Sequence, residues 1–297
     1  MPIRDCRNPA FKKLIKNNKN SFPNNLLLGF ELEALIPWRH IPHYRNSYEP
    51  IGEKYAISLD KKYKDLKRVF YAKNDGSVEG RASFHGLEIN SHPFNWNWFI
   101  DNKKHFYNLA KFLEESKSMC NRTCGFHVHI NKKYFKGIAH RNRFLFMFYK
   151  NPDHVYRISK RPRKSDLENN GTPWEFSSMG KLSLNDILTY FSDGYEDEKY
   201  LAANIYHKDT IEVRIFQSTI NPMLFTSYLE YCMALAIYTK NASNILTLDK
   251  FNKYVKRNRN MYPNLFSSKL LEKPRSINYK SSVSSIKRNK FWKSIVG

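Results

Sequence analysis

The stretch "LLLGFELEALIP", from Leu26 to Pro37, places an apolar residue at every even-numbered position, whereas Glu31 and Glu33 lie at odd-numbered positions. Because alternate side chains of a β-strand share a face, this pattern predicts one apolar face and one face that carries both carboxylates. Their Cα atoms would lie about 6.6 Å apart. Like charges at that distance raise each other's pKa unless a cation lies between them. The stretch therefore predicts a buried strand with a cation beside it.

Three later stretches repeat this arrangement, with apolar residues on one face and polar residues on the other. They are "GLEINSHP", "GFHVHIN" and "DTIEVRIF", and their polar residues are Glu88 with Asn90, His127 with His129, and Glu212 with Arg214. Taken singly, a strand glutamate more often faces solvent, and a histidine pair is more often structural. Four strands of the same design favour one common site, on the polar face of an antiparallel sheet that helices cover on its other face.

The remaining segments carry weaker patterns. Residues 74–76, Asn-Asp-Gly, predict a turn before the second of these strands, and Asp101 is a candidate N-cap for the helix that follows it. Apolar spacing predicts further helices near 141–150 and over 222–246, with short helices in the tail. The stretch "YRISKRPRKSD", residues 156–166, has the composition of a loop.

The residue types on the polar face indicate a divalent cation and phosphate. Carboxylates predominate among them, which favours a hard ion such as Mg²⁺ or Mn²⁺. Arg214, which shares a face with Glu212, offers the planar fork that suits phosphate oxygens. Metal ions and arginine recur around transferring phosphoryl groups. The chain has neither a GxxxxGK[ST] loop nor a GxGxxG motif, so a nucleotide site would have to be built on the sheet face.

Four motifs in order carry a resemblance to a known family: "GFELEA", "DGS…GLEINSHP", "GFHVHIN" and "YLAANIYHKDTIEVRIFQSTINP". Over residues 26–240 the chain resembles the putative amidoligase family, carboxylate–amine ligases of the glutamine synthetase and glutamate–cysteine ligase superfamily. The resemblance implies an α+β, glutamine-synthetase-like fold: an antiparallel β-sheet with helices packed on its outer face and the active site on the concave face. It also implies ATP-dependent amide bond formation, in which a carboxylate is phosphorylated and an amine or ammonia displaces phosphate from the acyl phosphate.

The resemblance further implies roles for individual positions. The implied ligands of Mg²⁺ or Mn²⁺ are Glu31, Glu33, Glu88, His127 and Glu212. The implied catalytic residues are Glu33, Glu88 and Arg214. The implied ATP-binding residues are His129, Asn204 and Arg214, and Arg214 would hold the terminal phosphate.

Three other positions bear on the resemblance. Asp75 matches the aspartate of the "DGS" turn, as a substrate-binding or structural residue. Lys199 stands where the family has an arginine, and His92 stands where it more often has proline. The departure at Lys199 concerns nucleotide or phosphate binding.

Positive charge gathers at the two ends of the chain. The net charge is +23 over 297 residues; residues 1–25 hold six Lys or Arg against one Asp, and residues 251–297 hold twelve against one Glu. We therefore expect a basic N-terminal arm at 1–25, an amidoligase-like catalytic domain at 26–246 and a basic C-terminal extension at 247–297. Nucleic acid or another polyanion would meet these ends, although solvated surface helices would carry the same charge.

Cysteine spacing and the length of the apolar stretches indicate the cellular compartment of the protein. The four cysteines have neither disulfide-framework nor zinc-ribbon spacing. No apolar stretch reaches the roughly 18 residues of a membrane span, and the N-terminus has no stretch that resembles a signal peptide. We therefore expect a reducing, cytoplasmic setting and no membrane partner.

Three functions fit these observations. The first is the ligase, with a carboxylate and an amine from small molecules, peptides or proteins as substrates. The second is a metal-dependent hydrolase that binds zinc through the His-x-His strand. The third is a non-catalytic or repurposed member that binds nucleic acid, or joins a larger assembly, through its basic ends.

Overall fold

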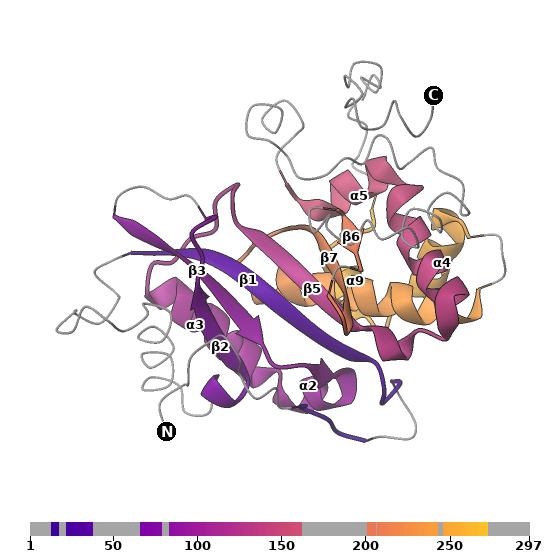
Figure 1. The fold of residues 1–297 in the computed structure, drawn as a ribbon, viewed down its shortest axis with the longest axis horizontal. Helices are drawn as coiled ribbons and strands as arrows, with labels where there is room; N and C mark the ends of the chain where they lie inside the picture. Colours follow the sequence, from indigo (N-terminus) through magenta and orange to yellow (C-terminus); the bar gives the residue numbers. More distant parts are fainter. Residues whose placement is uncertain are drawn as a thin grey trace, which may run out of the picture.

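The computed structural model describes residues 13–17, 22–37, 66–78, 83–161, 201–205, 207–242 and 246–272. In these ranges the chain forms an α+β fold around an open, seven-stranded antiparallel sheet (Figure 1). The strands are β1 Leu27–Pro37, β2 Phe70–Asn74, β3 Phe84–Ser91, β4 Phe94–Asn95, β5 Gly125–Asn131, β6 Ala203–Asn204 and β7 Thr210–Gln217. Their spatial order is β2-β3-β1-β5-β7-β6, and β4 pairs with the start of β1. The long strand β1 therefore lies inside the sheet.

The described helices follow the strands in sequence and pack around them. They are α2 Trp96–Asn102, α3 Lys104–Glu115, α4 Gly137–Tyr149, α5 Pro152–Ser159, α9 Pro222–Asn241, α10 Leu248–Arg257 and α11 Pro263–Ser267, with short 3-10 turns η2 Leu66–Arg68 and η3 Lys132–Tyr134. None of these helices is long and apolar enough to cross a membrane.

The apolar face of the sheet packs against α3 and α9 (Figure 1). Phe30, in the middle of β1, stacks on Phe126 of β5 with 5.1 Å between ring centroids. It also contacts Phe106 of α3 and Phe225 of α9, at 6.0 and 6.2 Å. Aromatic pairs of this kind add about 0.5–1.5 kcal/mol each beyond their buried area. Phe30 therefore packs the central strand against both helices that cover the sheet.

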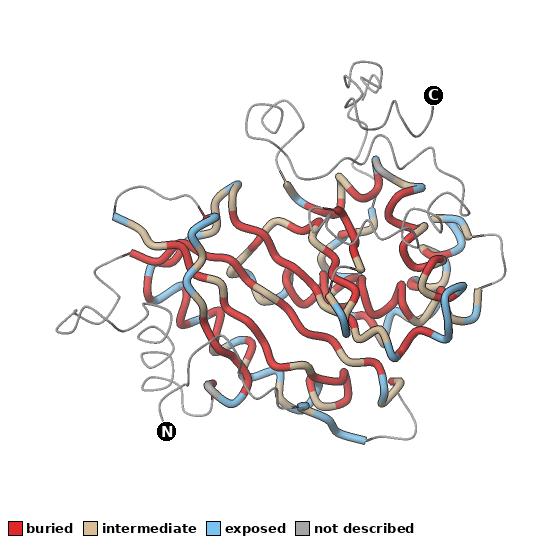
Figure 2. Tube along the Cα trace, in the orientation of Figure 1, coloured by how far each residue is buried: buried red, intermediate tan, exposed pale blue. Residues whose placement is uncertain are grey.

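Helix α9 is buried around most of its circumference, as Figure 2 shows for the centre of the molecule. A helix that is apolar on all sides must be covered on all sides. The sheet covers one side, and α4, α10 and α11 cover others. Phe251 of α10 and Leu265 of α11 are fully buried against this core. The first part of the basic segment 247–297 is thus integrated into the hydrophobic core.

A buried carboxylate fixes α11 to α9. Glu230 of α9 accepts the backbone N–H of Leu265 at 2.6 Å and the side-chain N–H of Asn264 at 2.8 Å. These bonds satisfy donors in the first turn of α11, which have no partner within the helix. Burial raises the pKa of Glu230 to about 7, although the hydrogen bonds from residues 264 and 265 oppose the rise.

The N-terminal segment 13–17 extends the edge of the sheet. Leu14 forms a parallel bridge to Phe94: its N–H donates to the carbonyl of Pro93 at 2.9 Å, and its carbonyl accepts the N–H of Asn95 at 3.1 Å. Lys16 pairs with Asp101 on the surface of α2. The described part of the basic arm therefore belongs to the folded unit.

The antiparallel sheet and its four strands with mixed faces confirm the sequence prediction, and the opening strand starts one residue later than predicted. Two local predictions are wrong. Asp101 does not cap a helix, because it lies inside α2, where the side chain of Asn95 caps the first turn. Part of the predicted loop at 156–166 is helical, because residues up to Ser159 complete α5 and bury Ile158. The predicted helix over 222–246 ends earlier, at Asn241.

Candidate metal and phosphate site

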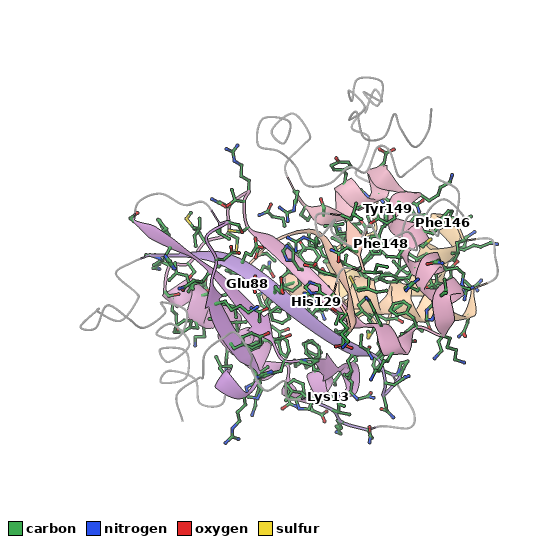
Figure 3. All side chains as sticks on the ribbon, viewed as in Figure 1. Lys13, Glu88, His129, Phe146, Phe148 and Tyr149 are labelled. Atoms are coloured by element: carbon green, nitrogen blue, oxygen red, sulfur yellow. The ribbon has the colours of Figure 1, made fainter. Side chains whose placement is uncertain are left out.

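Strand register brings the polar residues of four strands to one area of the sheet. Glu33 of β1 lies directly opposite Glu88 of β3, and Glu31 lies opposite His127 of β5. His129 of β5 lies opposite Glu212 of β7. Opposite side chains in antiparallel pairs have Cβ atoms about 4.5–5.5 Å apart. Figure 3 labels Glu88 and His129, which lie on the strands at either side of β1.

His127 lies at the centre of this area and contacts three carboxylates. Its Nδ1 is 3.0 Å from Glu31 Oε2 and 3.4 Å from Glu212 Oε1. Its Nε2 is 3.5 Å from Glu33 Oε1. The imidazole is buried, with only 4% of the side chain exposed. Three acidic groups from two strands thus converge on one buried ring.

A β-bulge between β5 and β7 sets the position of Arg214. Val128 pairs with Val213 and Phe126 pairs with Phe216, so β7 has one residue more than β5 over this interval. The extra residue keeps Phe216 on the apolar face, and it leaves Arg214 opposite the region of His127. Bulges commonly re-aim side chains beside functional sites. Here the bulge places the Arg214 guanidinium beside the acidic cluster.

Glu212 is the most thoroughly bound carboxylate of the cluster. Its Oε1 accepts a hydrogen bond from Arg214, and its Oε2 accepts one from the Asn204 side chain at 3.0 Å. His207 Nε2 lies 3.3 Å from the same Oε2. Burial alone would raise the pKa of this carboxyl, but His207, His129 and Arg214 lower the pKa to about 2. Glu212 is therefore an anion fixed in place on both oxygens.

Glu31 and His129 perturb each other in opposite directions. Glu31 Oε1 lies 3.2 Å from His129 Nε2. Burial opposes ionisation of Glu31, yet the histidines at 129 and 127 hold its pKa well below the usual value. Burial likewise lowers the pKa of His129, but Glu31, Glu212 and Glu88 outweigh it and raise the pKa. The cluster favours positive charge next to its carboxylates.

Glu33 has a different environment. Its Oε2 accepts the backbone N–H of Gly125, at the start of β5. Burial raises the pKa of Glu33, although His127, the Gly125 amide and Arg161 act in the opposite direction. Gly125 permits this close approach, because a Cβ atom there would lie 2.6 Å from His127 Nε2 and 2.8 Å from the Arg161 guanidinium. Gly125 and Arg161 therefore help to define the site.

Glu88 lies at the edge of the acidic area. Its Oε1 accepts hydrogen bonds from Asn90 at 2.7 Å and from Lys73 of β2 at 3.2 Å. Lys73 lies opposite Glu88 in the register of β2 and β3. The structure thus brings the ligand atoms of Glu31, His127 and Glu212 within 4.8 Å of one another. It also places Glu33 3.5 Å from His127 and holds Glu88 with Lys73 and Asn90.

Two groups of side chains have the composition and spacing of divalent-cation sites within the described part of the chain. One is Glu31, His127 and Glu212, and the other is His129, His207 and Glu212; in each group the ligand atoms lie within 4.8 Å of one another. The first group is rich in carboxylates, which suits Mg²⁺ or Mn²⁺. The donor set therefore fits the predicted ion.

Three residues of this site escaped the sequence prediction: Lys73, Arg161 and His207. Lys73 could have been found, because "FYAKN" has the same alternation as the four recognised strands. Arg161 follows α5, a helix whose end was predicted as a loop because of its composition. His207 precedes β7 and belongs to no alternating pattern, so only the three-dimensional structure places it beside Glu212.

The remaining predicted positions have simpler roles or lie elsewhere. Asp75 closes its own turn by accepting the N–H and the hydroxyl of Ser77, at 2.8 and 2.6 Å. His92 is buried, with its ring 5.4 Å from that of Tyr71. Lys199 lies outside the described residues. Asn204, a predicted ATP-binding residue, donates a hydrogen bond to Glu212.

A sheet face with buried carboxylates, histidines and an arginine defines a candidate cation and phosphate site. In agreement with this, residues 42–236 match the model of a family described as "Putative amidoligase enzyme". The chain belongs to this family, as the sequence motifs predicted. A search among curated proteins gives no match. The matched range begins after β1, yet Glu31 and Glu33 of that strand contact His127, which lies within it.

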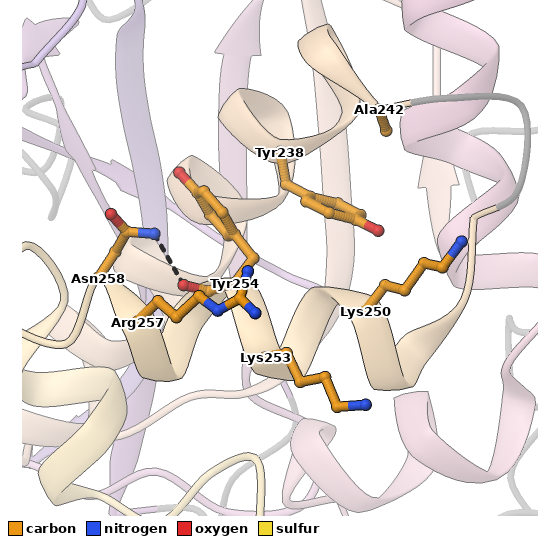
Figure 4. A pocket seen from close by; sticks show the side chains of 7 residues that line it. All are labelled: Tyr238, Ala242, Lys250, Lys253, Tyr254, Arg257 and Asn258. Carbon is orange, nitrogen blue, oxygen red and sulfur yellow. Dashed lines mark hydrogen bonds between the residues drawn. The ribbon is translucent and has the colours of Figure 1, made fainter.

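A separate pocket of about 510 Å³ lies between α9 and α10 (Figure 4). The rings of Tyr238 and Tyr254 line it, and so do the cationic side chains of Lys250, Lys253 and Arg257. None of the described residues that line it carries a carboxylate, so its chemistry differs from that of the acidic cluster on the sheet.

Proposed function

We propose that the protein is an ATP-dependent carboxylate–amine ligase that forms an amide bond through an acyl phosphate. The observation that carries this proposal is the contact of His127 with Glu31 and Glu212, together with Arg214 bound to the second carboxylate. This combination offers cation ligands and a phosphate-binding fork side by side. Membership of the amidoligase family supports the same reaction class.

Glu31, His127 and Glu212 would hold a Mg²⁺ ion, with Glu33 and Glu88 extending the acidic surface for a further ion toward β3. Bound there, divalent ions would neutralise charge on the ATP phosphates and on the substrate carboxylate. The mutual repulsion of the glutamates would decrease in the same event. The ions would add to the positive charge that Arg214, Lys73 and the histidines already place beside the carboxylates.

The protein's own groups bind and orient the reactants. Arg214 donates to oxygens of the transferring phosphoryl group, and its bond to Glu212 fixes the plane of the guanidinium. His129 and Asn204 line the same edge, and we assign them to the nucleotide. Fixed donors and burial favour the charge distribution of the transition state without reorganisation.

Hydroxylamine tests this proposal without knowledge of the natural amine, because it converts acyl phosphates to hydroxamates. The full chain, ATP, Mg²⁺ and a panel of carboxylic acids should yield hydroxamate and ADP in equal amounts for at least one acid. Product should require Mg²⁺ and should be lost in Arg214→Ala. Hydroxamate formed without ATP, or at the same rate by Arg214→Ala, would contradict the proposal.

A second candidate function, polyanion binding, rests on the pocket between α9 and α10. Cationic groups beside tyrosine rings are typical of surfaces that bind single-stranded nucleic acid through phosphate contacts and base stacking. Lys250 and Arg257 are exposed, and they line the pocket with Tyr238 and Tyr254 (Figure 4). We propose that this surface, rather than the basic ends as a whole, meets a polyanion.

Point substitutions test this better than truncation, because removing residues 251–297 would also remove buried Phe251 and Leu265 from the core. The double variant Lys250→Glu/Arg257→Glu should bind an oligo-dT strand at least tenfold more weakly at low salt. The matched control, Lys104→Glu/Lys111→Glu, makes the same charge change on exposed positions of α3. Equal losses in the two variants would mean that only net charge matters, which would contradict a site at the pocket.

A further inference from the structure

His129, His207 and Glu212 form a second group of possible ligands, in which the proposed reaction gives His207 no role. Their ligand atoms lie within 4.8 Å of one another, and the rings of His129 and His207 meet edge to face with centroids 5.1 Å apart. The side chain of His207 is 43% exposed, so it can adjust its position and is accessible from solvent. Glu212 is 1% exposed and provides a fixed anion beneath the two rings.

His129 has the second contact that metal-binding histidines usually have. Its Nδ1 lies 3.1 Å from the hydroxyl oxygen of Thr210, which can accept a hydrogen bond from Nδ1–H and leave the Nε2 lone pair available. Nε2 is buried and faces Glu31 Oε1 at 3.2 Å. A buried imidazole nitrogen oriented in this way is suited to bind a cation.

Two carboxylates connect this group to the first one. Glu212 directs Oε1 toward His127 and Oε2 toward His207. Glu31 divides its oxygens in the same manner, with Oε2 toward His127 and Oε1 toward His129. Glu212, which belongs to both groups, therefore presents one oxygen to each of them, which is the arrangement of a ligand that bridges two neighbouring ions.

The two groups differ in donor type, and this difference sets their preference for ions. The first has two carboxylates and one imidazole, whereas the second has two imidazoles and one carboxylate. Imidazole favours borderline ions such as Co²⁺, Ni²⁺ or Zn²⁺ over Mg²⁺. We propose that His129, His207 and Glu212 bind a borderline transition-metal ion next to a Mg²⁺ ion held by Glu31, His127 and Glu212.

Under this assignment His129 would meet the nucleotide phosphates through the bound cation. It shares Glu212 with the proposed ligase site but does not depend on the reaction. The alternative is that His207 forms only an ion pair with Glu212, whose Oε2 lies 3.3 Å from His207 Nε2. An ion pair needs no metal, so a metal count separates the two accounts.

Equilibrium dialysis of the chelator-treated full chain against Co²⁺, in millimolar Mg²⁺ and without nucleotide, tests the proposal. The wild type should retain one Co²⁺ per chain against the excess of Mg²⁺, with visible d–d absorption that reports nitrogen ligands. His207→Ala should bind this ion at least tenfold more weakly, as expected for the loss of one ligand. His85→Ala, a histidine of β3 outside both groups, should behave as the wild type.

Two results would overturn the proposal: a wild type that retains no Co²⁺ in excess Mg²⁺, or a His207→Ala variant with the affinity and spectrum of the wild type. Thermal unfolding of each variant in the absence of metal identifies misfolding. For a misfolded His207→Ala, His207→Gln provides the same comparison with a side chain closer in size. A failure of ADP release or hydroxamate formation would leave these metal counts unchanged, so the two proposals fail separately.

Discussion

Glu31 and His127 lie directly opposite each other on β1 and β5, and Glu31 Oε2 is 3.0 Å from His127 Nδ1. Strand register alone creates this contact, because both residues occupy the polar face at the same level of the sheet. The same register places Glu33 opposite Glu88 and His129 opposite Glu212. The site is thus a property of sheet pairing, and a slip of one residue in any of these strands would send its polar groups into the apolar core.

Arg214 should be indispensable for ATP turnover. Its guanidinium is held by Glu212 beside the predicted metal ligands, so Arg214→Ala removes a fixed donor to the phosphoryl group. Loss of one such donor typically costs about 10²–10³ in kcat. Arg214→Lys should recover little activity, since lysine has no planar fork. Turnover by Arg214→Ala at the wild-type rate, with Mg²⁺ and substrates saturating, would remove the residue from the mechanism.

Glu33→Gln should abolish turnover while leaving the fold intact. The side-chain oxygen of glutamine can still accept the Gly125 N–H that Glu33 now accepts, so little packing is lost. The negative charge beside His127 is lost, however, and with it a predicted cation ligand. Titration calorimetry with Mg²⁺ and ATP should show weaker binding, and circular dichroism should be unchanged. A Glu33→Gln protein with full turnover would exclude an essential charge at this position.

Gly125 acts as a positioning residue. A methyl group at this position would lie 2.6 Å from His127 Nε2 and 2.8 Å from the Arg161 guanidinium, so Gly125→Ala should displace His127 from the three carboxylates. We expect at least a tenfold loss of Mg²⁺ affinity. Gly76→Ala is the matched control, because a Cβ there meets nothing within 4 Å. If both variants bound Mg²⁺ like the wild type, the close approach at Gly125 would have no role in metal binding.

Glu230 should make the stability of the protein depend on pH. Its folded-state pKa of about 7 lies above the ordinary value of 4.5, so the folded protein binds the proton more tightly than the unfolded chain. The resulting stabilisation is complete below pH 4.5 and is lost as the pH rises through 7. At about 1.4 kcal/mol for each unit of pKa shift, the loss is on the order of 3 kcal/mol.

Thermal unfolding between pH 5 and 8 measures this effect. The wild-type Tm should fall with rising pH by more than the Tm of Glu230→Gln, in which the group cannot titrate. Other titrating residues are common to both proteins, so the difference between the two slopes isolates Glu230. Parallel slopes would mean that Glu230 is ionised in the folded protein throughout this range.

Much of the sheet could be predicted from the sequence, because burial on one face leaves a strict alternation in the strand residues. Phe30 and Leu32 alternate with Glu31 and Glu33 in this way. The order in which these strands pair does not follow from periodicity, although four strands of the same design already favoured one common site. The helix caps were harder: Asp101 has the residue type of an N-cap, yet Asn95 caps α2 because β4 ends there.

The parts of the site that sequence could not predict depend on contacts distant in the chain. His207 reaches Glu212 from outside any regular strand pattern, and Arg161 reaches Glu33 from the end of α5. Neither residue belongs to an alternating or helical sequence pattern that would predict where its side chain points. The role of Gly125 could not be predicted from the sequence either, because this residue acts by leaving room for the His127 ring.

A crystal structure of the protein with a non-hydrolysable ATP analogue and Mg²⁺ would show whether this sheet face binds metal and nucleotide phosphates together. We expect Mg²⁺ bound by Glu31, His127 and Glu212, with the terminal phosphate of the analogue in contact with that ion and with Arg214. Phosphates bound away from this face of the sheet, or bound there without a metal ion on these three residues, would contradict the account.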